Sequence, residues 1–558
     1  MTLPPHSTTE PSDRSTSHRP PAYDRRWWIL GVLVLSLVVV MTANTSLNVA
    51  IPSIVRDTGA SPTQLQWIVD AYALVFAGLL LTAGAVGDRF GRKGALMAGL
   101  AIFGTMSLLA TMAEDPGALI AIRATQGLGA ALLMPGTLSI LAAVFPPDER
   151  PRAIAIWAGF AGSGAAIGIV GSGWLLEHFW WGSVFFVNVP IVATALVLVG
   201  WLVPTSRDPR RLPLDVIGAL LSIVALGSLL FAIIEAPERG WTDAATLGAF
   251  AAAAVGLAGF LAWERRREFP MLDLHFFASR PFTVGTTTIA LTFFAMFGLF
   301  FVLTQYLQSV RGYTPLEAGV RILPLMAAMI PASTLSARWA ARFGSRAVLT
   351  AGLSLLTAGL LVLASLGTST SYWVLAGGLV LLGTGMGNVA APATGAVMSS
   401  LPVAKAGVGS AVNDTAREVG GALGIAVLGS LLSSAYRTSL SGVAGVPEAS
   451  LATAERSIGA ALQEASHLGG DAGMALADAA RSAYADAMGI ALVVAAAVTL
   501  LTIVFVRRSL PRRARVPEPS APSEPADGAV AVEADDPVSA TAARPGSTAS
   551  TSQSLPAA

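Results

Sequence analysis

The sequence predicts an all-α integral membrane protein, and three observations support this fold class. Of its 558 residues, 54% are hydrophobic and only 12% are charged, whereas soluble domains carry about 25% charged residues. The mean hydropathy is +0.65. Apolar segments long enough to cross the ~30 Å hydrocarbon layer as helices recur along most of the chain. Lipid is therefore expected to be the main solvent of this protein.

The apolar segments divide the chain into two similar parts. Fourteen of them are long enough to span a membrane, near 27–50, 65–86, 94–113, 117–144, 153–176, 184–203, 214–234, 244–263, 282–307, 317–339, 347–367, 372–397, 408–435 and 484–506. We expect a disordered cytoplasmic tail (1–26), a six-helix bundle (27–204), two linker transmembrane helices (214–263), a second six-helix bundle (281–506) with an external loop (436–483), and a disordered cytoplasmic tail (507–558). For the external loop, two alternatives are open: short amphipathic helices over the outer mouth, or a disordered loop.

Charge and repetition agree with this layout. Lysine and arginine are concentrated in the loops on the side of the amino terminus, which predicts that both termini are cytoplasmic. Asp88-Arg-Phe-Gly-Arg-Lys93 is echoed by Ala341-Arg-Phe-Gly-Ser-Arg346, as expected of two equivalent halves. The formal net charge of +1 argues against a nucleic-acid surface. There is no cysteine, and the histidines lie in tails, loops or span edges, so no metal site is expected.

The second predicted span, Leu65–Val86, carries an acid near each end. Asp70 and Asp88 are 18 residues apart, which is about five helical turns, so they share one face of the helix. A carboxylate inside a membrane is costly and is a functional-site hypothesis by default. The alternative is that Asp70 lies in the membrane interface and faces water.

Four motifs carry a resemblance to a known family: Gly84-x-x-x-Asp88-Arg-Phe-Gly-Arg-Lys93 after span 2, Arg123-Ala-Thr-Gln126-Gly127-Leu-Gly129 in span 4, Gly164-Ala-Ala-Ile-Gly168-x-x-x-x-Gly173 in span 5, and Asn48-Val-Ala-Ile-Pro52 in span 1. From about Trp27 to Arg508, the sequence resembles the major facilitator superfamily and, within it, the fourteen-span drug:proton antiporters. It looks most like the branch that exports quaternary ammonium compounds and methyl viologen. It departs from the family pattern at Ala43, where an acid is usual, and at Ala165 and Ile169, where prolines are usual.

The resemblance implies the major facilitator fold, with two six-helix bundles and two extra helices between them, and no enzymatic activity. It implies a secondary active multidrug efflux transporter that exchanges protons for amphipathic, cationic compounds by alternating access. No cofactor is expected, because the proton gradient would supply the energy. A monomer in the plasma (inner) membrane, contacting lipid, protons and small molecules, is expected. The alternatives are a dedicated exporter of one endogenous metabolite or antibiotic, and a proton-coupled uptake symporter.

Asp70 and Arg123 are the predicted proton-coupling residues, because they lie at similar depth, about five and about six residues in from the outer ends of their spans. Burial and a nearby arginine act on a carboxyl group in opposite directions, so the net effect on Asp70 stays open. The predicted substrate cavity contains, besides these two, Asn44, Asn48, Trp67, Gln126 and Tyr306.

Two further groups of residues are candidates. The resemblance implies a cytoplasmic latch between the halves, made of Gly84, Asp88, Arg89, Gly91, Arg92 and Lys93. The alternative for this motif is positive charge that only fixes orientation. Span 13 opens with Asp414, Arg417 and Glu418, which form either a second charge site or a structural pair near the cytoplasmic end.

Overall fold

Helices form all of the regular structure in the residues that the computed structural model describes, which are 25–146, 149–206, 215–268, 270, 272–401, 406–440 and 446–510. The expected tails, 1–26 and 507–558, lie almost entirely outside these residues. Some side chains within helices are also outside them, including those of Asn44, Asp88 and much of 151–166.

The first half of the chain contains α1 (Arg26–Thr58), α2 (Pro62–Phe90), α3 (Arg92–Ala110), α4 (Pro116–Val144), α5 (Arg150–His178), α6 (Ser183–Phe186) and α7 (Asn188–Leu202). The linker pair is α8 (Val216–Arg239) and α9 (Ala244–Arg266). The second half contains η1 (Leu274–Ala278), α10 (Arg280–Gln305), the π-helical turn η2 (Tyr306–Val310), α11 (Pro315–Phe343), α12 (Ser345–Ala364), α13 (Tyr372–Ser399), α14 (Ala406–Leu440), α15 (Glu448–Ala454), α16 (Ile458–Leu468) and α17 (Gly470–Ser509).

Thirteen helical segments of the described chain are long and apolar enough to cross a membrane. They coincide with thirteen of the fourteen expected spans. The remaining span, 153–176, falls on the 29-residue helix α5, where many side chains are outside the described set. The number fourteen therefore stays a prediction, while the all-α membrane architecture is confirmed.

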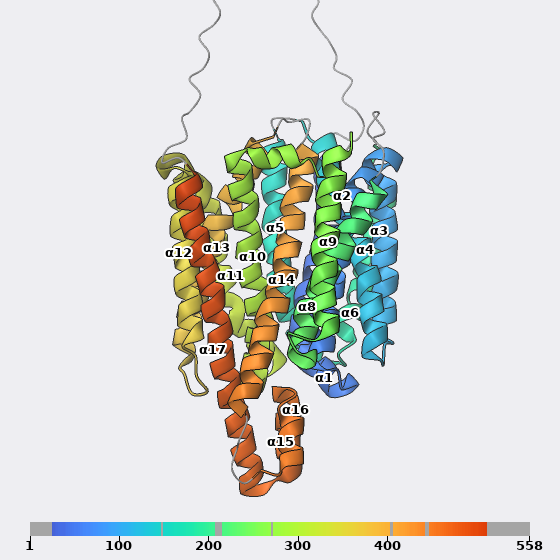
Figure 1. Ribbon diagram of the computed structural model, residues 1–558. Helices are drawn as coiled ribbons and strands as arrows, with labels where there is room; N and C mark the ends of the chain where they lie inside the picture. Colours follow the sequence, from blue (N-terminus) through green and yellow to red (C-terminus); the bar gives the residue numbers. More distant parts are fainter. Residues whose placement is uncertain are drawn as a thin grey trace, which may run out of the picture. The chain divides into compact units, whose positions relative to one another are not determined.

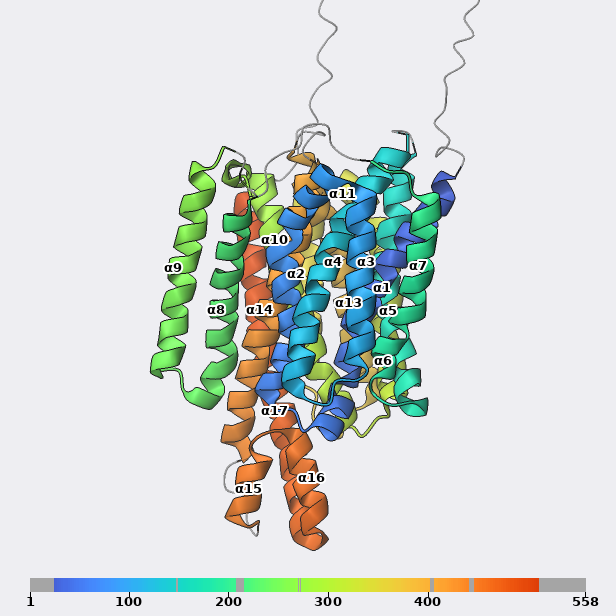
Figure 2. The same ribbon diagram turned by 90° about the vertical axis from the view of Figure 1, so that its right-hand side faces the viewer.

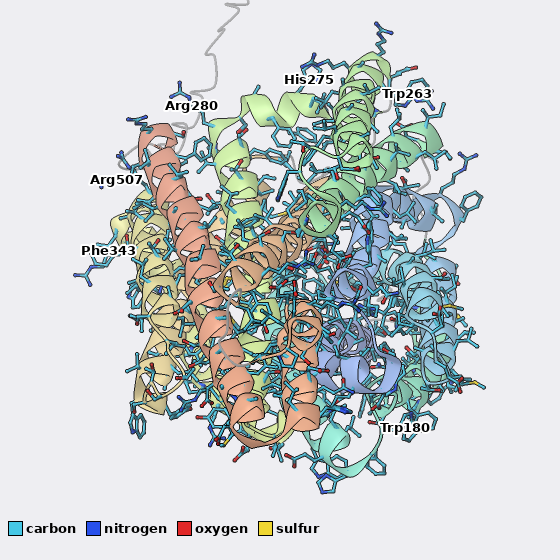
Figure 3. All side chains as sticks on the ribbon, turned by 60° about the horizontal axis from the view of Figure 1, so that its bottom comes forward. Trp180, Trp263, His275, Arg280, Phe343 and Arg507 are labelled. Atoms are coloured by element: carbon cyan, nitrogen blue, oxygen red, sulfur yellow. The ribbon has the colours of Figure 1, made fainter. Side chains whose placement is uncertain are left out.

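The long helices run roughly side by side, so the molecule has two ends (Figure 1). We call the end where α1 begins and α17 finishes the terminal side. The opposite end, where α15 and α16 project beyond the other helices, is the hairpin side (Figure 2). Arg280 and Arg507 lie at the terminal side, whereas Trp180 lies at the hairpin side (Figure 3).

The two halves repeat the same local structure in α2 and α11. Each helix has 29 residues, begins with a proline, and is preceded by a capping box, made by Ser61 and Gln64 in one and by Thr314 and Glu317 in the other. Such boxes satisfy the free N–H groups of a helix's first turn. A glycine with positive φ ends both helices, so the echoed Arg-Phe-Gly sequence makes the same tight turn in each half.

Glycines also let the central helix of each half approach its neighbours closely. In α4, a Cβ added at Gly127 would collide with the Tyr72 carbonyl of α2, and one at Gly129 would lie 2.9 Å from the Gly99 carbonyl of α3. Helix α13 repeats the arrangement, since a Cβ at Gly385 would lie 2.7 Å from the Gly352 carbonyl of α12. Small residues of this kind allow backbone-to-backbone packing between membrane helices.

The halves meet along two seams, α2 with α14 and α5 with α11. At the α5–α11 seam, a Cβ added at Gly173 would lie 2.7 Å from Leu316 Cα. Helix α8 covers the α2–α14 seam, because it packs on both of these helices. Ser430 of α14 donates a 2.7 Å hydrogen bond to the Ile233 carbonyl of α8. Within the described residues, neither α8 nor α9 packs on the α5–α11 seam.

The range 436–483, expected as an external loop, is largely helical in its described part. It contains the end of α14, the whole of α15 and α16, and the first third of α17. The Tyr436 hydroxyl donates to the Ala454 carbonyl at 3.3 Å and so ties α15 to α14. Of the two alternatives for this range, the structure therefore has the short helices. Residues 441–445 lie outside the described set.

Gly385→Ala is expected to lower the unfolding temperature of the purified protein. The added methyl would press on the backbone of α12, and overpacking costs about 1–3 kcal/mol. Gly377→Ala on the same helix is the matched control, because nothing lies within 4 Å of its added Cβ. That control should be neutral or stabilising by about 0.5–1 kcal/mol. Thermal unfolding in detergent measures both, and equal unfolding temperatures would contradict the close α12–α13 contact.

Candidate functional site

Arg123 is the centre of a buried hydrogen-bond network that joins α2, α3 and α4. Its side chain is 0% exposed. Nη1 donates to Gln126 Oε1 at 2.6 Å and Nε donates to the Ile68 carbonyl at 3.2 Å. Gln126 Nε2 in turn donates to Ser107 Oγ at 2.8 Å. The guanidinium group lies 4.3 Å from the centre of the Tyr72 ring, a cation–π distance.

The start of α4 and its glycines place this arginine. Asp115 caps the helix by accepting from the Ala118 N–H at 2.8 Å, and Arg123 follows two turns later. Gly127, one turn beyond Arg123, brings α4 against the α2 backbone. The residues of the span-4 motif thus act together. Gly127 allows α4 to approach α2 closely, and at this short distance Arg123 can donate a hydrogen bond to the α2 backbone.

Asp70 lies at a junction of α2, α14 and α8. Its neighbours one turn away on the same face identify the surroundings. Gln66 lies against Gly429 of α14, and Ala73 packs in a cluster with α14 and α8. Trp67 and Leu74 face α8, where Trp67 is 6.4 Å from the Phe231 ring. Asp70 itself is 0% exposed, and neither of its carboxyl oxygens has a hydrogen-bond partner among the described residues.

Asp70 and Arg123, the predicted proton-coupling residues, do not pair in this structure, and their role in coupling stays a prediction. No ion pair joins them in the described part of the chain, although both side chains are described. Arg123 contacts α2 at Ile68 and Tyr72, each two residues from Asp70, which is about 200° around the helix. Equal depth in the membrane was the basis for the pairing, and depth carries no information about which way a side chain points.

The expected cavity residues do not form one cluster. Gln126 bonds to Arg123, whereas Trp67 packs against α8. The Tyr306 hydroxyl donates to the Gly367 carbonyl at 2.7 Å within the second half. Asn48 is partly buried on α1, and the Asn44 side chain lies outside the described set. None of these five is among the described residues that line the cavity between the halves.

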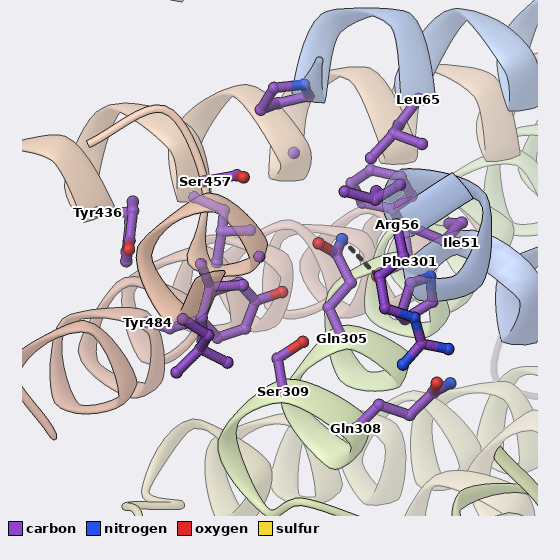
Figure 4. A pocket seen from close by; sticks show the side chains of 18 of the residues that line it. Ile51, Arg56, Leu65, Phe301, Gln305, Gln308, Ser309, Tyr436, Ser457 and Tyr484 are labelled. Atoms are coloured by element: carbon purple, nitrogen blue, oxygen red, sulfur yellow. Dashed lines mark hydrogen bonds between the residues drawn. The ribbon is translucent and has the colours of Figure 1, made fainter. Parts of the chain in front are cut away.

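A cavity of about 740 Å³ lies between the halves at the hairpin side (Figure 4). This volume is typical of sites for small molecules. Gln66, Gln305 and Gln308 contribute amides, and Gln308 Nε2 donates to the Val49 carbonyl of the other half at 3.0 Å. Helix α16 covers part of the cavity, and no Asp or Glu lines it among the described residues. Sequence reasoning missed these glutamines, although Gln66 precedes Asp70 by one helical turn.

The charged cluster of α14 is buried in the helix body. Asp414 and Glu418 are each 6% exposed, and Arg417 Nη1 lies 3.5 Å from Asp414 Oδ1. Asn413 accepts a 3.0 Å hydrogen bond from Thr394 of α13. Helix α14 packs on α2, and Glu418 lies close enough to act electrostatically on the Tyr72 hydroxyl. Glu418 lies about 18 Å along α14 from Ala406, deeper than an end position.

The expected latch residues surround the α2–α3 turn. Gly91 has φ +123° and Gly84 lies against Pro135 of α4. Arg92 Nη1 donates to the Ser139 carbonyl at 3.4 Å and Lys93 Nζ donates to the Gly200 carbonyl at 2.7 Å.

The remaining latch residues are Arg89, whose guanidinium lies 5.5 Å from the Phe90 ring, and Asp88, whose side chain is outside the described set. The hydrogen bonds described for Arg92 and Lys93 stay within the first half. A latch to the second half therefore stays a prediction.

The positions that depart from the family pattern lie in packed surroundings where they are described. Ala43 is buried in the core of the first half. Ile169 is buried on α5, and a Cβ added at Gly319 of α11 would lie 2.9 Å from its carbonyl. The Ala165 side chain is outside the described set.

Comparison with known proteins identifies the family. The model of the Major Facilitator Superfamily matches residues 33–425. The chain belongs to this superfamily. It is therefore a multi-pass membrane transporter and not an enzyme, and the expected fold class and family are confirmed.

Several similar proteins are named for efflux or resistance. The chain is 36% identical to the "Multidrug efflux pump LfrA" of Mycolicibacterium smegmatis, over 86% of this chain and 96% of that protein. It is 35% identical to the "Tetracenomycin C resistance and export protein" of Streptomyces glaucescens, over 88% and 94%. It is also 35% identical to the "Methyl viologen resistance protein SmvA" of Salmonella typhimurium, over 88% and 99%.

Solved structures agree on the fold. A bacterial homologue of the human lysosomal transporter Spinster, in an inward-facing and unoccupied conformation, superposes with a TM-score of 0.62 at 19% identity, over 88% of this chain and 99% of that one. The human organic anion transporter MFSD10 gives 0.55 at 16% identity, over 87% and 100%. At these identities the likeness concerns the fold alone.

Gln126→Leu is expected to destabilise the protein, because it leaves Arg123 Nη1 and Ser107 Oγ without this partner. Leaving buried polar groups unsatisfied costs about 1–3 kcal/mol, and more for charged groups. Thr125→Val is the matched control, since its exposed hydroxyl bonds only to the Ala121 carbonyl of its own helix. Thermal unfolding in detergent should separate the two variants. A Gln126→Leu protein as stable as the control would contradict a structural role for the Arg123 network.

Proposed function

We propose that the protein is a secondary active multidrug efflux transporter that exchanges protons for amphipathic, cationic compounds by alternating access. One observation carries the proton part of this proposal. Asp70 is fully buried and has no hydrogen-bond partner among the described residues. A buried charge without a partner is costly, so this arrangement favours the neutral, protonated carboxyl group. The charged carboxylate is favoured when a cation or water reaches it.

Coupling between proton and cargo follows because both compete for the Asp70 carboxyl group. When Asp70 holds a proton, a cationic cargo gains little from it, and when the proton leaves, the carboxylate attracts the cation. Proton and cargo therefore occupy the transporter alternately. Asp414 and Glu418 on α14 form the proposed second charge site, because both are buried and Arg417 neutralises only part of their charge. Arg123, held among neutral partners, is assigned a structural role in this scheme.

The names of the similar proteins support efflux as the direction of transport. The expected excess of lysine and arginine on the terminal side supports a plasma-membrane orientation with that side in the cytoplasm. The hairpin-side cavity would then open toward the outside. The proton gradient supplies the energy without a cofactor, since moving one charge through 100 mV is worth about 2.3 kcal/mol.

A dedicated exporter of one antibiotic is the second candidate function. It is favoured by the similarity to a protein named for tetracenomycin C alone. Such an exporter would share Asp70, Arg123 and the α14 cluster. A resistance profile across unrelated dyes and antibiotics separates the candidates, because a dedicated exporter protects against one structural class only.

Asp70→Asn is expected to lower the initial rate of ethidium efflux from energised cells by about 100-fold, the order of effect of losing a positioned proton-transfer group. An uncoupler should lower wild-type efflux to a similar rate. Asp478→Asn is the control, because Asp478 is exposed on α17 and pairs only with Arg481. Efflux that is indifferent to both Asp70→Asn and the uncoupler would refute proton coupling and leave the fold assignment intact.

A further inference from the structure

Two buried polar groups follow one another on the same face of α2. Gln66 is 3% exposed, and its Oε1 has no hydrogen-bond partner among the described residues. Asp70, one turn further along, is likewise without one. Side chains four residues apart on a helix have Cβ atoms about 6 Å apart. Gln66 lines the hairpin-side cavity and Asp70 does not. Gln66 is therefore one turn closer to the cavity than Asp70.

The remaining surroundings of Asp70 on this face are apolar. Leu230 and Ile234 of α8 pack with Ala73 of α2 and with Ala422 and Ala426 of α14. This cluster separates Asp70 from the lipid beside the α2–α14 seam. Of the side chains one turn from Asp70 on this face, those of Gln66 and Trp67 carry polar groups, and of these two only Gln66 is among the described residues that line the cavity.

Two arginines, Arg56 and Arg456, line the cavity end of this path. Arg123 of α4 lies on the opposite side of α2. On α14, Glu418 precedes Ala422 of this cluster by one turn, about 6 Å toward the terminal side, and is the nearest acid on that helix, since Asp414 and Arg417 lie further along. Helix α8 carries no charge before Glu235, which pairs with Arg239 at 2.8 Å.

The space around the Gln66 amide depends on a glycine. A Cβ added at Gly429 of α14 would lie 2.6 Å from Gln66 Nε2. The absence of a side chain at Gly429 thus gives the amide room beside the seam. The cavity that the amide enters carries no carboxyl group of its own among its described lining residues, so it contains no competing acid.

We propose that Gln66 is the positioning residue through which Asp70 exchanges its proton with the hairpin-side cavity, a proposal that rests on the proton coupling proposed above. An amide can satisfy both states of the acid. Its N–H donates to the carboxylate, and its carbonyl oxygen accepts from the protonated carboxyl group. Rotation of the amide therefore follows the protonation state, and a leucine of similar size offers neither bond.

The exchange itself is a simple proton transfer. A hydronium ion in the cavity gives its proton to a carboxylate oxygen of Asp70 and leaves as water. In the reverse step, water accepts the proton from the carboxyl group and returns to the cavity as hydronium. Gln66 gains and loses no proton in either direction, and it acts by holding the carboxyl group and the water in hydrogen-bond contact.

The test uses the full chain in proteoliposomes containing a pH-sensitive dye, with ethidium as the cargo. Proton flux coupled to ethidium and equilibrium binding of ethidium in detergent are measured across a range of pH. Gln66→Leu should lower coupled proton flux by about tenfold or more, as expected when a reacting group is mispositioned. Its ethidium affinity should stay within about twofold of wild type, because Asp70 is retained. Gln66→Glu, which keeps the length and an acceptor oxygen, should restore most of the flux.

Two further variants separate positioning from cavity shape. Gln64→Leu also removes an amide from α2, but Gln64 does not line the cavity and its Oε1 accepts from the Ser61 N–H at 2.9 Å, so its flux should match wild type. Gly429→Ala keeps the Gln66 amide and crowds it, so its flux should fall. Flux in Gln66→Leu equal to wild type, or an equal fall in Gln64→Leu, would overturn the assignment of Gln66. Absence of coupled flux in wild type, or full flux in Asp70→Asn, would instead overturn the proposed function.

Discussion

A carboxyl group held between three helices without a hydrogen-bond partner among the described residues is the constraint on which the rest of this structure depends. Asp70 can occupy this place at low cost only while it is neutral or while a cation or water reaches it. The helices around it provide the necessary enclosure. Helix α14 supplies small residues along the seam, and α8 supplies large apolar ones. The linker pair is thus more than a connection between two bundles, since one of its helices completes the surroundings of the acid.

The two faces of α2 contact different parts of the molecule. The face with Ile68 and Tyr72 is bonded to Arg123 and, through Gln126 and Ser107, to α3. These contacts join three helices of the first half into one unit. The face with Gln66 and Asp70 instead meets the second half and α8. A single helix therefore connects the hydrogen-bonded interior of the first half to the seam between the halves, where the proposed alternating-access cycle would act.

Much of the fold could be predicted from the sequence, because helix-length apolar runs and turn motifs are local signals. Thirteen expected spans coincide with helices, and the repeated Arg-Phe-Gly sequence marks the same turn in both halves. The capping boxes before Pro62 and Pro315 are equally local. Residues 436–483 were ambiguous, because α15 and α16 depend on packing as well as on their own sequence.

The candidate site was harder to predict, because it depends on how each helix is rotated. Asp70 was found from composition alone, since an acid in an apolar run stands out. Arg123, expected beside Asp70, bonds to other groups in this structure, because two residues at equal depth can face opposite ways. Trp67 and Tyr306 are expected in the cavity from the sequence, yet Trp67 packs against α8 and Tyr306 bonds to Gly367. Gln66 could have been noticed as a second polar residue on the strip that contains Asp70.

The packing of α8 beside Asp70 links the presence of the two linker helices to the presence of a buried acid on α2. Without the linker pair, this strip of α2 would lose the apolar cover that Leu230 and Ile234 of α8 provide. A carboxyl group beside that gap would lie nearer to the acyl chains, where a charge is costly. The two additional helices thus contribute to the conditions under which an acid can be kept at this position.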